Sequence, residues 1–259
     1  MNSPWVVSSN TASGDAKITD GHGIGHAGDP NGIGAVSFMD QGIDASVNII
    51  HTANSYSLAA GTATTTMIMG WSAHPHTDLL DDGYSAGNEI FQIGLLSSST
   101  GLMGVAGAES FYLAGIEESA SLATNQTNVV LSMADTNGVL GSFNGGTPIT
   151  FDSKDYHVFK LGMTPDLAGN VNVTLEMDLF ISSGIYGTFT YGGNTNLGTI
   201  SVANNVAKVG NMFPALGFKL EDSSKVSITG ASFDTAPVPE PSSALLLFAS
   251  SLLLIKRRR

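Results

Sequence analysis

Val171-Asn-Val-Thr-Leu-Glu-Met-Asp-Leu-Phe-Ile181 alternates apolar with mostly polar residues along its whole length. A period of two is that of a β-strand with one face against a core, because successive side chains point to opposite faces of a sheet. An α-helix would repeat its apolar residues every three to four positions instead. The stretch therefore predicts a half-buried strand over Val171–Ile181.

Similar short apolar or alternating runs occur along most of the chain, separated by glycine- and asparagine-rich turn signals. The further predicted strands are Ala35–Met39, Ala45–Thr52, Thr64–Trp71, Glu89–Leu96, Asn128–Ala134, Asp155–Met163, Gly184–Tyr191, Leu197–Ala203, Pro214–Leu220 and Lys225–Phe233. Many short strands with frequent turns predict an all-β fold, a β-sandwich or jelly roll of antiparallel strands.

Two local signals refine this prediction. Asn137-Gly138 lies between two apolar runs, which predicts a β-hairpin closed by a type I′ turn. The stretch Gly115–Ala123 carries Glu117 and Glu118, and acidic residues favour the first turn of a helix. We therefore expect one short helix at that place.

The charge of the chain excludes one class of function. It has 10 Lys and Arg against 22 Asp and Glu, a net charge of -12, and no Lys or Arg between Lys17 and Lys154. Nucleic-acid affinity rests largely on basic side chains that neutralise phosphates, so we exclude nucleic-acid binding. The absence of cysteine excludes disulfides, thiolate metal sites and thiol catalysis.

The C-terminal end of the chain has three unlike parts. Prolines at 237, 239 and 241 predict a stiff, extended linker. The apolar run Ala244–Ile255 follows, and as a helix from Ser242 it would span about 21 Å, short of the ~30 Å hydrocarbon core of a bilayer. The last four residues are basic and would remain on the cytoplasmic side. They are Lys256, Arg257, Arg258 and Arg259.

These parts together resemble the PEP-CTERM sorting tail of Gram-negative envelope proteins, with Pro239, Glu240 and Pro241 as the sorting motif. The resemblance implies recognition by an exosortase, a membrane-embedded protease or transpeptidase that removes the tail near this motif. It also implies export, transient anchoring in the inner membrane through 244–255, and a final place at the cell surface or in the extracellular matrix. We accordingly divide the chain into a sandwich domain, 1–235, and a sorting tail, 236–259.

The N-terminus does not fit a secretory signal peptide. Met1-Asn-Ser-Pro-Trp-Val-Val-Ser8 has a short apolar run, and no basic residue precedes Lys17. A signal peptide needs a basic region and a longer apolar segment. Either the start codon is misplaced, the chain is already trimmed, or export uses another route; of these we favour a missing N-terminal segment.

The body of the chain resembles concanavalin-like lectin and glucanase sandwiches. The residues that carry this resemblance are Tyr156–Leu161, the strand after Thr164-Pro165-Asp166, and Gly217–Leu220 with Val226–Ile228. It implies a sandwich that contacts carbohydrate.

Glu176 and Asp178 are the candidate catalytic pair, because residues i and i+2 of a strand share one face. Laminarinase-like glucanases, to which the motif is similar, carry a third carboxylate where this chain has Phe180 and Ile181. Their acidic motif also precedes the Tyr-His strand, whereas here it follows that strand. A solvated strand face is the alternative interpretation, and it is the one we favour.

Two loops carry candidate metal ligands. Asp78, Asp81 and Asp82 would suit calcium, which prefers hard oxygen ligands, and His74 and His76 lie nearby. A glycine-rich loop with His22 and His26 would need tertiary support to hold an ion. For both segments, a plain surface loop is the simpler interpretation.

The leading hypothesis is an exported, non-enzymatic sandwich protein of the envelope or matrix that contacts polysaccharide. We expect no cofactor, and calcium is the one candidate ion. The alternative is a divergent glycan hydrolase that uses Glu176 and Asp178.

Overall fold

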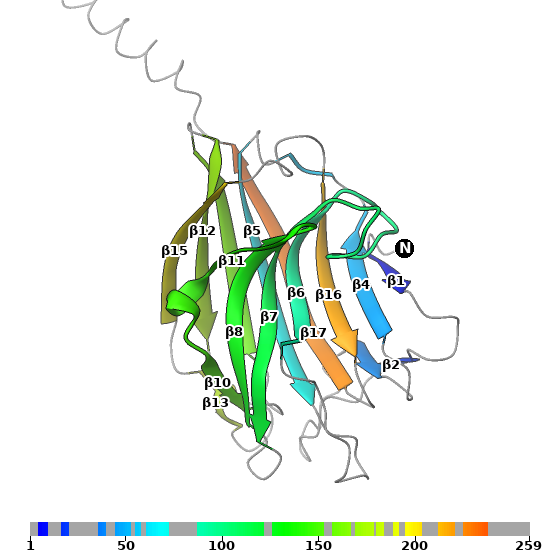
Figure 1. Cartoon of the computed structure of the whole chain (residues 1–259). Helices are drawn as coiled ribbons and strands as arrows, with labels where there is room; N and C mark the ends of the chain where they lie inside the picture. Colours follow the sequence, from blue (N-terminus) through cyan, green and yellow to red (C-terminus); the bar gives the residue numbers. More distant parts are fainter. Residues whose placement is uncertain are drawn as a thin grey trace, which may run out of the picture.

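A computed structural model of the chain gives the fold (Figure 1). It describes residues 5–9, 17–20, 36–39, 45–52, 55–57, 61–72, 87–121, 126–152, 157–166, 169–178, 180–183, 189–191, 195–203, 212–220 and 225–237. Within these ranges the elements are β-strands apart from a single short 3-10 turn, η2 (Phe143–Gly146). The predicted all-β class is therefore confirmed.

One layer is an eight-stranded antiparallel sheet with the order β1-β4-β16-β6-β7-β8-β10, in which β9 also pairs with β8. Its strands are β1 (Trp5–Ser9), β4 (Ala45–His51), β16 (Phe213–Leu220), β6 (Glu89–Leu96), β7 (Ser110–Ser121), β8 (Gln126–Asp135), β9 (Gly138–Ser142) and β10 (Ile149–Asp152). This sheet faces the viewer in Figure 1.

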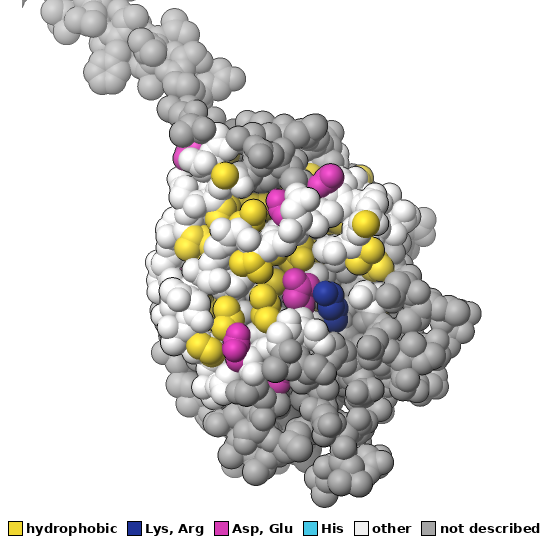
Figure 2. All heavy atoms as spheres, in the orientation of Figure 1, with side chains coloured by type: hydrophobic (Ala, Val, Ile, Leu, Met, Phe, Trp, Pro, Cys, Tyr) yellow, Lys and Arg dark blue, Asp and Glu magenta, His cyan; other side chains and the backbone are white. Residues whose placement is uncertain are grey.

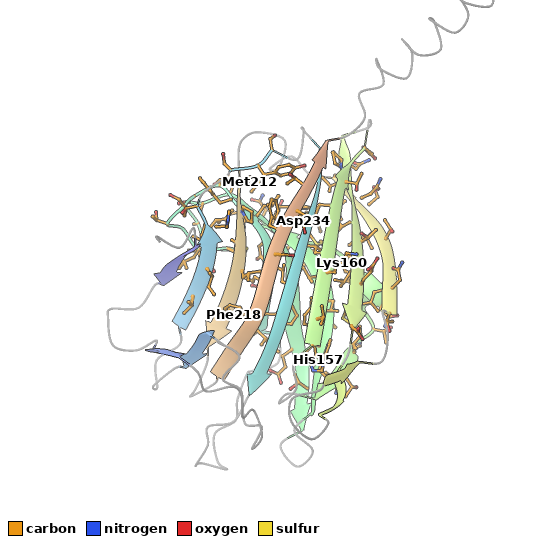
Figure 3. The ribbon with its side chains drawn as sticks, turned by 180° about the vertical axis from the view of Figure 1, so that it is seen from behind. His157, Lys160, Met212, Phe218 and Asp234 are labelled. Atoms are coloured by element: carbon orange, nitrogen blue, oxygen red, sulfur yellow. The ribbon has the colours of Figure 1, made fainter. Side chains whose placement is uncertain are left out.

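The other layer is a seven-stranded antiparallel sheet with the order β15-β12-β11-β5-β17-β3-β2. Its strands are β15 (Thr195–Ala203), β12 (Asn170–Asp178), β11 (His157–Pro165), β5 (Gly61–Ser72), β17 (Lys225–Pro237), β3 (Val36–Met39) and β2 (Lys17–Asp20). Figure 3 shows this sheet from its own side, with Lys160 on β11 and Asp234 on β17. A small separate sheet pairs β13 (Phe180–Ser183) with β14 (Phe189–Tyr191).

The main core lies between the two large sheets. It combines Phe91 and Phe111 of one sheet with Phe159 and Leu175 of the other. The rings of Phe91 and Phe159 meet across the layers with centroids 4.8 Å apart. Packing of this kind between two antiparallel sheets defines a β-sandwich.

The stretch that predicted the fold behaves as expected over most of its length. In β12 the buried residues alternate strictly with half-buried ones. The strand is shorter than predicted, because β12 ends at Asp178 and Phe180–Ser183 pairs within the small separate sheet. The other predicted strands correspond to β3, β4, β5, β6, β8, β11, β14, β15, β16 and β17.

The predicted helix at Gly115–Ala123 is wrong, because β7 is a strand from Ser110 to Ser121. It pairs with β6 on one side and with β8 on the other. These two sets of backbone hydrogen bonds outweigh the weak helical signal of Glu117 and Glu118, since local propensity yields to tertiary pairing.

The predicted hairpin joins β8 to β9, but its turn is not type I′. A type I′ turn needs positive φ at both central residues, and among the described non-glycine residues φ is positive at Asn144 alone. Here the Asn137 N–H donates to Asp135 Oδ1 (2.7 Å), and Gly138 takes the positive φ of 126°. Asp135 thus shapes the turn through its side chain.

Strand β17 pairs with β5 up to Pro237, so residues 236 and 237 are strand and not unpaired linker. The motif Pro239–Pro241, the apolar run and the basic end lie outside the described residues. In the part of the chain that the structure describes, no helix is long and apolar enough to cross a membrane. The division at 235 and 236 stays a prediction.

Candidate functional site on the outer face of the eight-stranded sheet

The eight-stranded sheet has an outer face that points away from the core. Strand register places Asn48 opposite Gly217, Gly217 opposite Gln92, and Gln92 opposite Ala114 on that face. The next row holds Ile50, Ala215, Gly94, Tyr112 and Ala134. Small residues thus form much of the floor, and polar side chains stand between them. Figure 2 shows this face, with apolar side chains spread among a few charged ones.

Residues Ser97–Glu109 join β6 to β7 and fold over this face; we call them the strap. The base of the strap is closed by two hydrogen bonds, from the Ser97 N–H to the Glu109 carbonyl and from the Glu109 N–H to Ser97 Oγ, both 2.8 Å. From this base the chain reaches across β16 in Figure 1.

The strap buries a second apolar cluster beneath it. Met103, which is 1% exposed, lies with residues of β4, β6, β7, β8 and β16. The other buried members are Ile50, Leu96, Ala108, Tyr112, Ala114, Ala134 and Ala215. As a result, β6 is buried at every position from Ile90 to Leu96, on both of its faces.

A charged group lies beside the strap. Glu89, the first residue of β6, accepts hydrogen bonds from Gln92 Nε2 (2.6 Å) and the Tyr112 hydroxyl (3.2 Å). Its carboxylate also pairs with Lys219 Nζ of β16 at 3.1 Å. Burial and the neighbouring Glu89 carboxylate raise the pKa of Tyr112 well above its usual value of 10.0. Tyr112 therefore remains a hydrogen-bond donor to Glu89 at neutral pH.

We call Glu89, Gln92, Tyr112 and Lys219 the Glu89 cluster. The Lys219 side chain is 35% exposed and that of Glu89 is 17% exposed, so solvent reaches both. A lysine ammonium has three N–H donors and a carboxylate has about four acceptor positions. The pair therefore offers a fixed donor and a fixed acceptor side by side, next to apolar surface.

The candidate catalytic residues lie on the opposite side of the molecule. Glu176 and Asp178 share the outer face of the seven-stranded sheet, as the spacing predicted. Glu176 Oε2 pairs with Lys160 Nζ at 3.2 Å across β11 and β12. Their catalytic role stays a prediction.

The remaining predicted site residues lie outside the described residues. They are Asp78, Asp81, Asp82, His22, His26, His74, His76, the sorting motif and the basic end. Across the described ranges, no group of three or more His, Asp and Glu could hold a metal ion. Calcium at the three aspartates stays a prediction.

Sequence reasoning missed the Glu89 cluster. Glu89 and Lys219 each stand in a correctly predicted strand, but nothing in the sequence indicates that β6 and β16 are neighbours. The strap carried a usable signal, because Gly101, Gly104 and Gly107 recur at every third position of the connection between β6 and β7.

No family model matches the chain, and no curated protein matches it. Several solved structures are similar in overall architecture. A lectin from Bauhinia forficata in complex with GalNAc is 10% identical, with a TM-score of 0.45, covering 91% of this chain and 100% of its own. The VIP36 exoplasmic/lumenal domain in its Ca2+/Man3GlcNAc-bound form is 10% identical, with a TM-score of 0.49 and coverages of 93% and 88%. A legume lectin-like domain from Entamoeba histolytica is 8% identical, with a TM-score of 0.47 and coverages of 90% and 90%.

Proposed function

We propose that this protein is an exported, non-enzymatic β-sandwich protein that contacts extracellular polysaccharide through the outer face of its eight-stranded sheet. The Glu89 cluster is the observation that carries this proposal. A sugar ring offers hydroxyl groups that both donate and accept, together with apolar C–H faces. A fixed donor and acceptor beside apolar surface match those needs.

Pre-organisation makes the Glu89 cluster a better candidate than an ordinary surface ion pair. Glu89 is held by Gln92 and Tyr112 as well as by Lys219. Groups that neighbouring bonds already hold in place lose less conformational entropy when a ligand binds. Glu89 and Lys219 can therefore receive a hydroxyl group without first becoming ordered.

Calorimetric titration of the full chain tests this proposal, with neutral β-glucan, N-acetylated hexosamine and uronate hexamers as ligands. We expect Glu89→Gln and Lys219→Met each to weaken binding of the tightest hexamer about tenfold, or about 1.4 kcal/mol. Lys160→Met and Glu176→Gln are the matched controls, because they remove a similar pair from the other outer face. Binding of no hexamer, or equal weakening by the controls, would refute the proposal.

The same hexamers distinguish this function from the hydrolase alternative. A non-enzymatic protein releases no new reducing ends on incubation with them. Turnover that Glu176→Gln abolishes would instead support the alternative, because hydrolysis needs a carboxylate as nucleophile or proton donor.

Delivery to the cell surface is the second part of the proposed function. The resemblance of residues 236–259 to a sorting tail supports removal of that tail by an exosortase, while 244–255 hold the precursor in the inner membrane. Replacing Pro239-Glu240-Pro241 by three alanines in the host should leave an uncleaved, membrane-bound precursor. Intact-mass measurement checks this, and a mature wild-type product that still carries Arg259 would refute sorting.

Calcium at Asp78, Asp81 and Asp82 belongs to the same proposal. An ion that binds only the folded state stabilises it by mass action. A chelator at neutral pH should therefore lower the melting temperature of the full chain, and an unchanged melting temperature would exclude a stabilising calcium loop.

A further inference from the structure

Strand β15 forms one end of the seven-stranded sheet and pairs with β12 (Figure 1). In the part of the chain that the structure describes, no strand pairs with the other side of β15. Its residues Thr199, Ser201 and Ala203 are exposed, whereas Ile200 and Val202 pack against the main core. The backbone N–H and C=O groups along that side of β15 therefore present an edge to which another extended strand can add.

β15 lacks the features that usually protect an edge strand. Natural edge strands are very short or carry charged side chains, lysine above all. The other end strands β1, β2 and β10 have five, four and four residues, and β2 also carries Lys17 and Asp20. β15 has nine residues, and none of them is charged. Its register with β12 shifts beside Gly198, which has a φ of 99°, so Thr199–Ala203 is its regular run.

The neighbouring edge of the other sheet is uncharged as well. Gly141 of β9 lies across from β15, because a Cβ on Gly141 would be 3.6 Å from Val202 Cγ1. No charged residue occurs from 136 to 151, a segment that contains β9 and η2. Val139 of β9 is 56% exposed. Strands β9 and β15 and the turn η2 therefore carry no charge, in a chain whose net charge is -12.

This charge distribution fits a second copy of the chain as the partner of β15. Two copies repel one another through their net charge, and this repulsion is weakest where both surfaces are uncharged. Antiparallel pairing about a two-fold axis at Ser201 places Ser201 opposite the partner's Ser201 and Ile200 opposite the partner's Val202. Hydroxyl groups then meet on the outer face and β-branched residues meet on the core side, and both are favourable cross-strand pairs.

We propose that two copies of this chain associate through β15, so that their seven-stranded sheets join into one continuous antiparallel sheet. This association goes beyond polysaccharide contact and does not depend on it. The two-fold axis is perpendicular to the joined sheet, so the outer faces of both eight-stranded sheets point to the same side. Two Glu89 clusters then face one polymer, which raises the apparent affinity without any new contact to the sugar.

Sedimentation equilibrium of the full chain tests the association. We expect the average mass to rise with protein concentration from that of one chain toward that of two. Ser201→Glu places two carboxylates opposite one another at the two-fold axis, and it should raise the dissociation constant of the dimer about tenfold. Thr164→Glu is the matched control, because it adds the same charge at an exposed position of the same row, on β11 instead of the edge.

Hydrogen exchange on the wild type gives a second measurement that needs no variant. Amides of residues 199–203 should exchange more slowly at high protein concentration than at low concentration, because pairing adds backbone hydrogen bonds along β15. Exchange in β10, an end strand of the other sheet, should not change with concentration.

Three results would overturn the proposal. The first is a chain that stays monomeric, and the second is a dimer that Ser201→Glu and Thr164→Glu weaken equally. The third is a dimer with unchanged exchange at 199–203, as association through the apolar run Ala244–Ile255 would give. None of these measurements contains a sugar, so their failure leaves polysaccharide contact standing, and failure of every hexamer to bind leaves the dimer standing.

Discussion

The two outer faces of the sandwich each carry a cross-strand lysine–glutamate pair, in very different surroundings. Lys160 and Glu176 on the seven-stranded sheet lie 3.2 Å apart, with side chains 49% and 32% exposed. Lys219 and Glu89 are 3.1 Å apart, and Glu89 is further held by Gln92 and Tyr112. The first pair lies on an open polar face, whereas the second stands at the edge of a covered one.

The strands that carry the two glutamates, β12 and β6, also differ in how far they are buried. In β12 every second residue is buried, while β6 is buried along its length after Glu89. The strap causes the difference, because it covers the outer side of β6. An outward position is therefore part of a core on one sheet and part of the surface on the other.

Leu96→Ala tests this contrast and should have the largest effect on the free energy of unfolding. Leu96 points outward from β6 yet is 0% exposed, so its loss should reduce the free energy of unfolding by about 2–5 kcal/mol, as in an ordinary core. Thr174→Ala, at an outward position of β12, should change it by less than about 0.5 kcal/mol. Urea unfolding measures both, and similar small values would mean that the strap does not form a core.

Gly104→Ala should have the next largest effect on the free energy of unfolding. It places a side chain at a φ of 69° and puts a Cβ within 2.6 Å of the Tyr112 hydroxyl oxygen. Gly145→Ala shares the strain at a φ of 62°, but its Cβ would meet no described atom within 4 Å. We expect about 2 kcal/mol of destabilisation for the first and about 1 kcal/mol for the second. Equal losses would show that the strap is not pressed against Tyr112.

Tyr112→Phe should alter the response to alkaline pH. Because the pKa of Tyr112 is raised, the folded state keeps a proton that the unfolded state releases above the usual tyrosine value of 10.0. Stability is therefore fully present below pH 10 and falls above it, by up to about 1.4 kcal/mol per pH unit from this group.

The difference between wild type and Tyr112→Phe isolates that effect, since other groups titrate in both proteins. When phenolate absorbance is measured against pH, the variant should lack the contribution of one tyrosine that titrates well above pH 10. Identical alkaline unfolding of the two proteins would contradict burial of the hydroxyl against Glu89.

Removing the carboxylate of either ion pair should change the free energy of unfolding least. Glu89→Gln should cost about 1 kcal/mol, because three donors lose a charged acceptor that is largely buried. Glu176→Gln should cost less than about 0.5 kcal/mol, as exposed pairs usually do. Thermal unfolding at low and high salt checks both, and a larger loss for Glu176→Gln would reverse the assignment of the two faces.

Local patterns predicted most strands because strand alternation is a property of neighbouring residues. Two of the errors arose where a longer-range or side-chain effect prevailed. Glu117 and Glu118 suggested a helix, but pairing with β6 and β8 made the segment a strand. Asn137-Gly138 suggested a type I′ turn, but the Asn137 N–H donates to Asp135 Oδ1, and φ is positive at Gly138 and not at Asn137.

The sequence by itself determined the all-β class, the alternation of β12 and the unusual composition of residues 236–259, because each depends on residues close together in the chain. Tertiary structure alone decided that Glu89 meets Lys219 and that the strap lies over Gly217. The physical reason is that strand order and register are set by packing between distant segments. A period of two tells which residues of a strand share a face. It does not tell which strand lies beside that strand, or which segment covers that face.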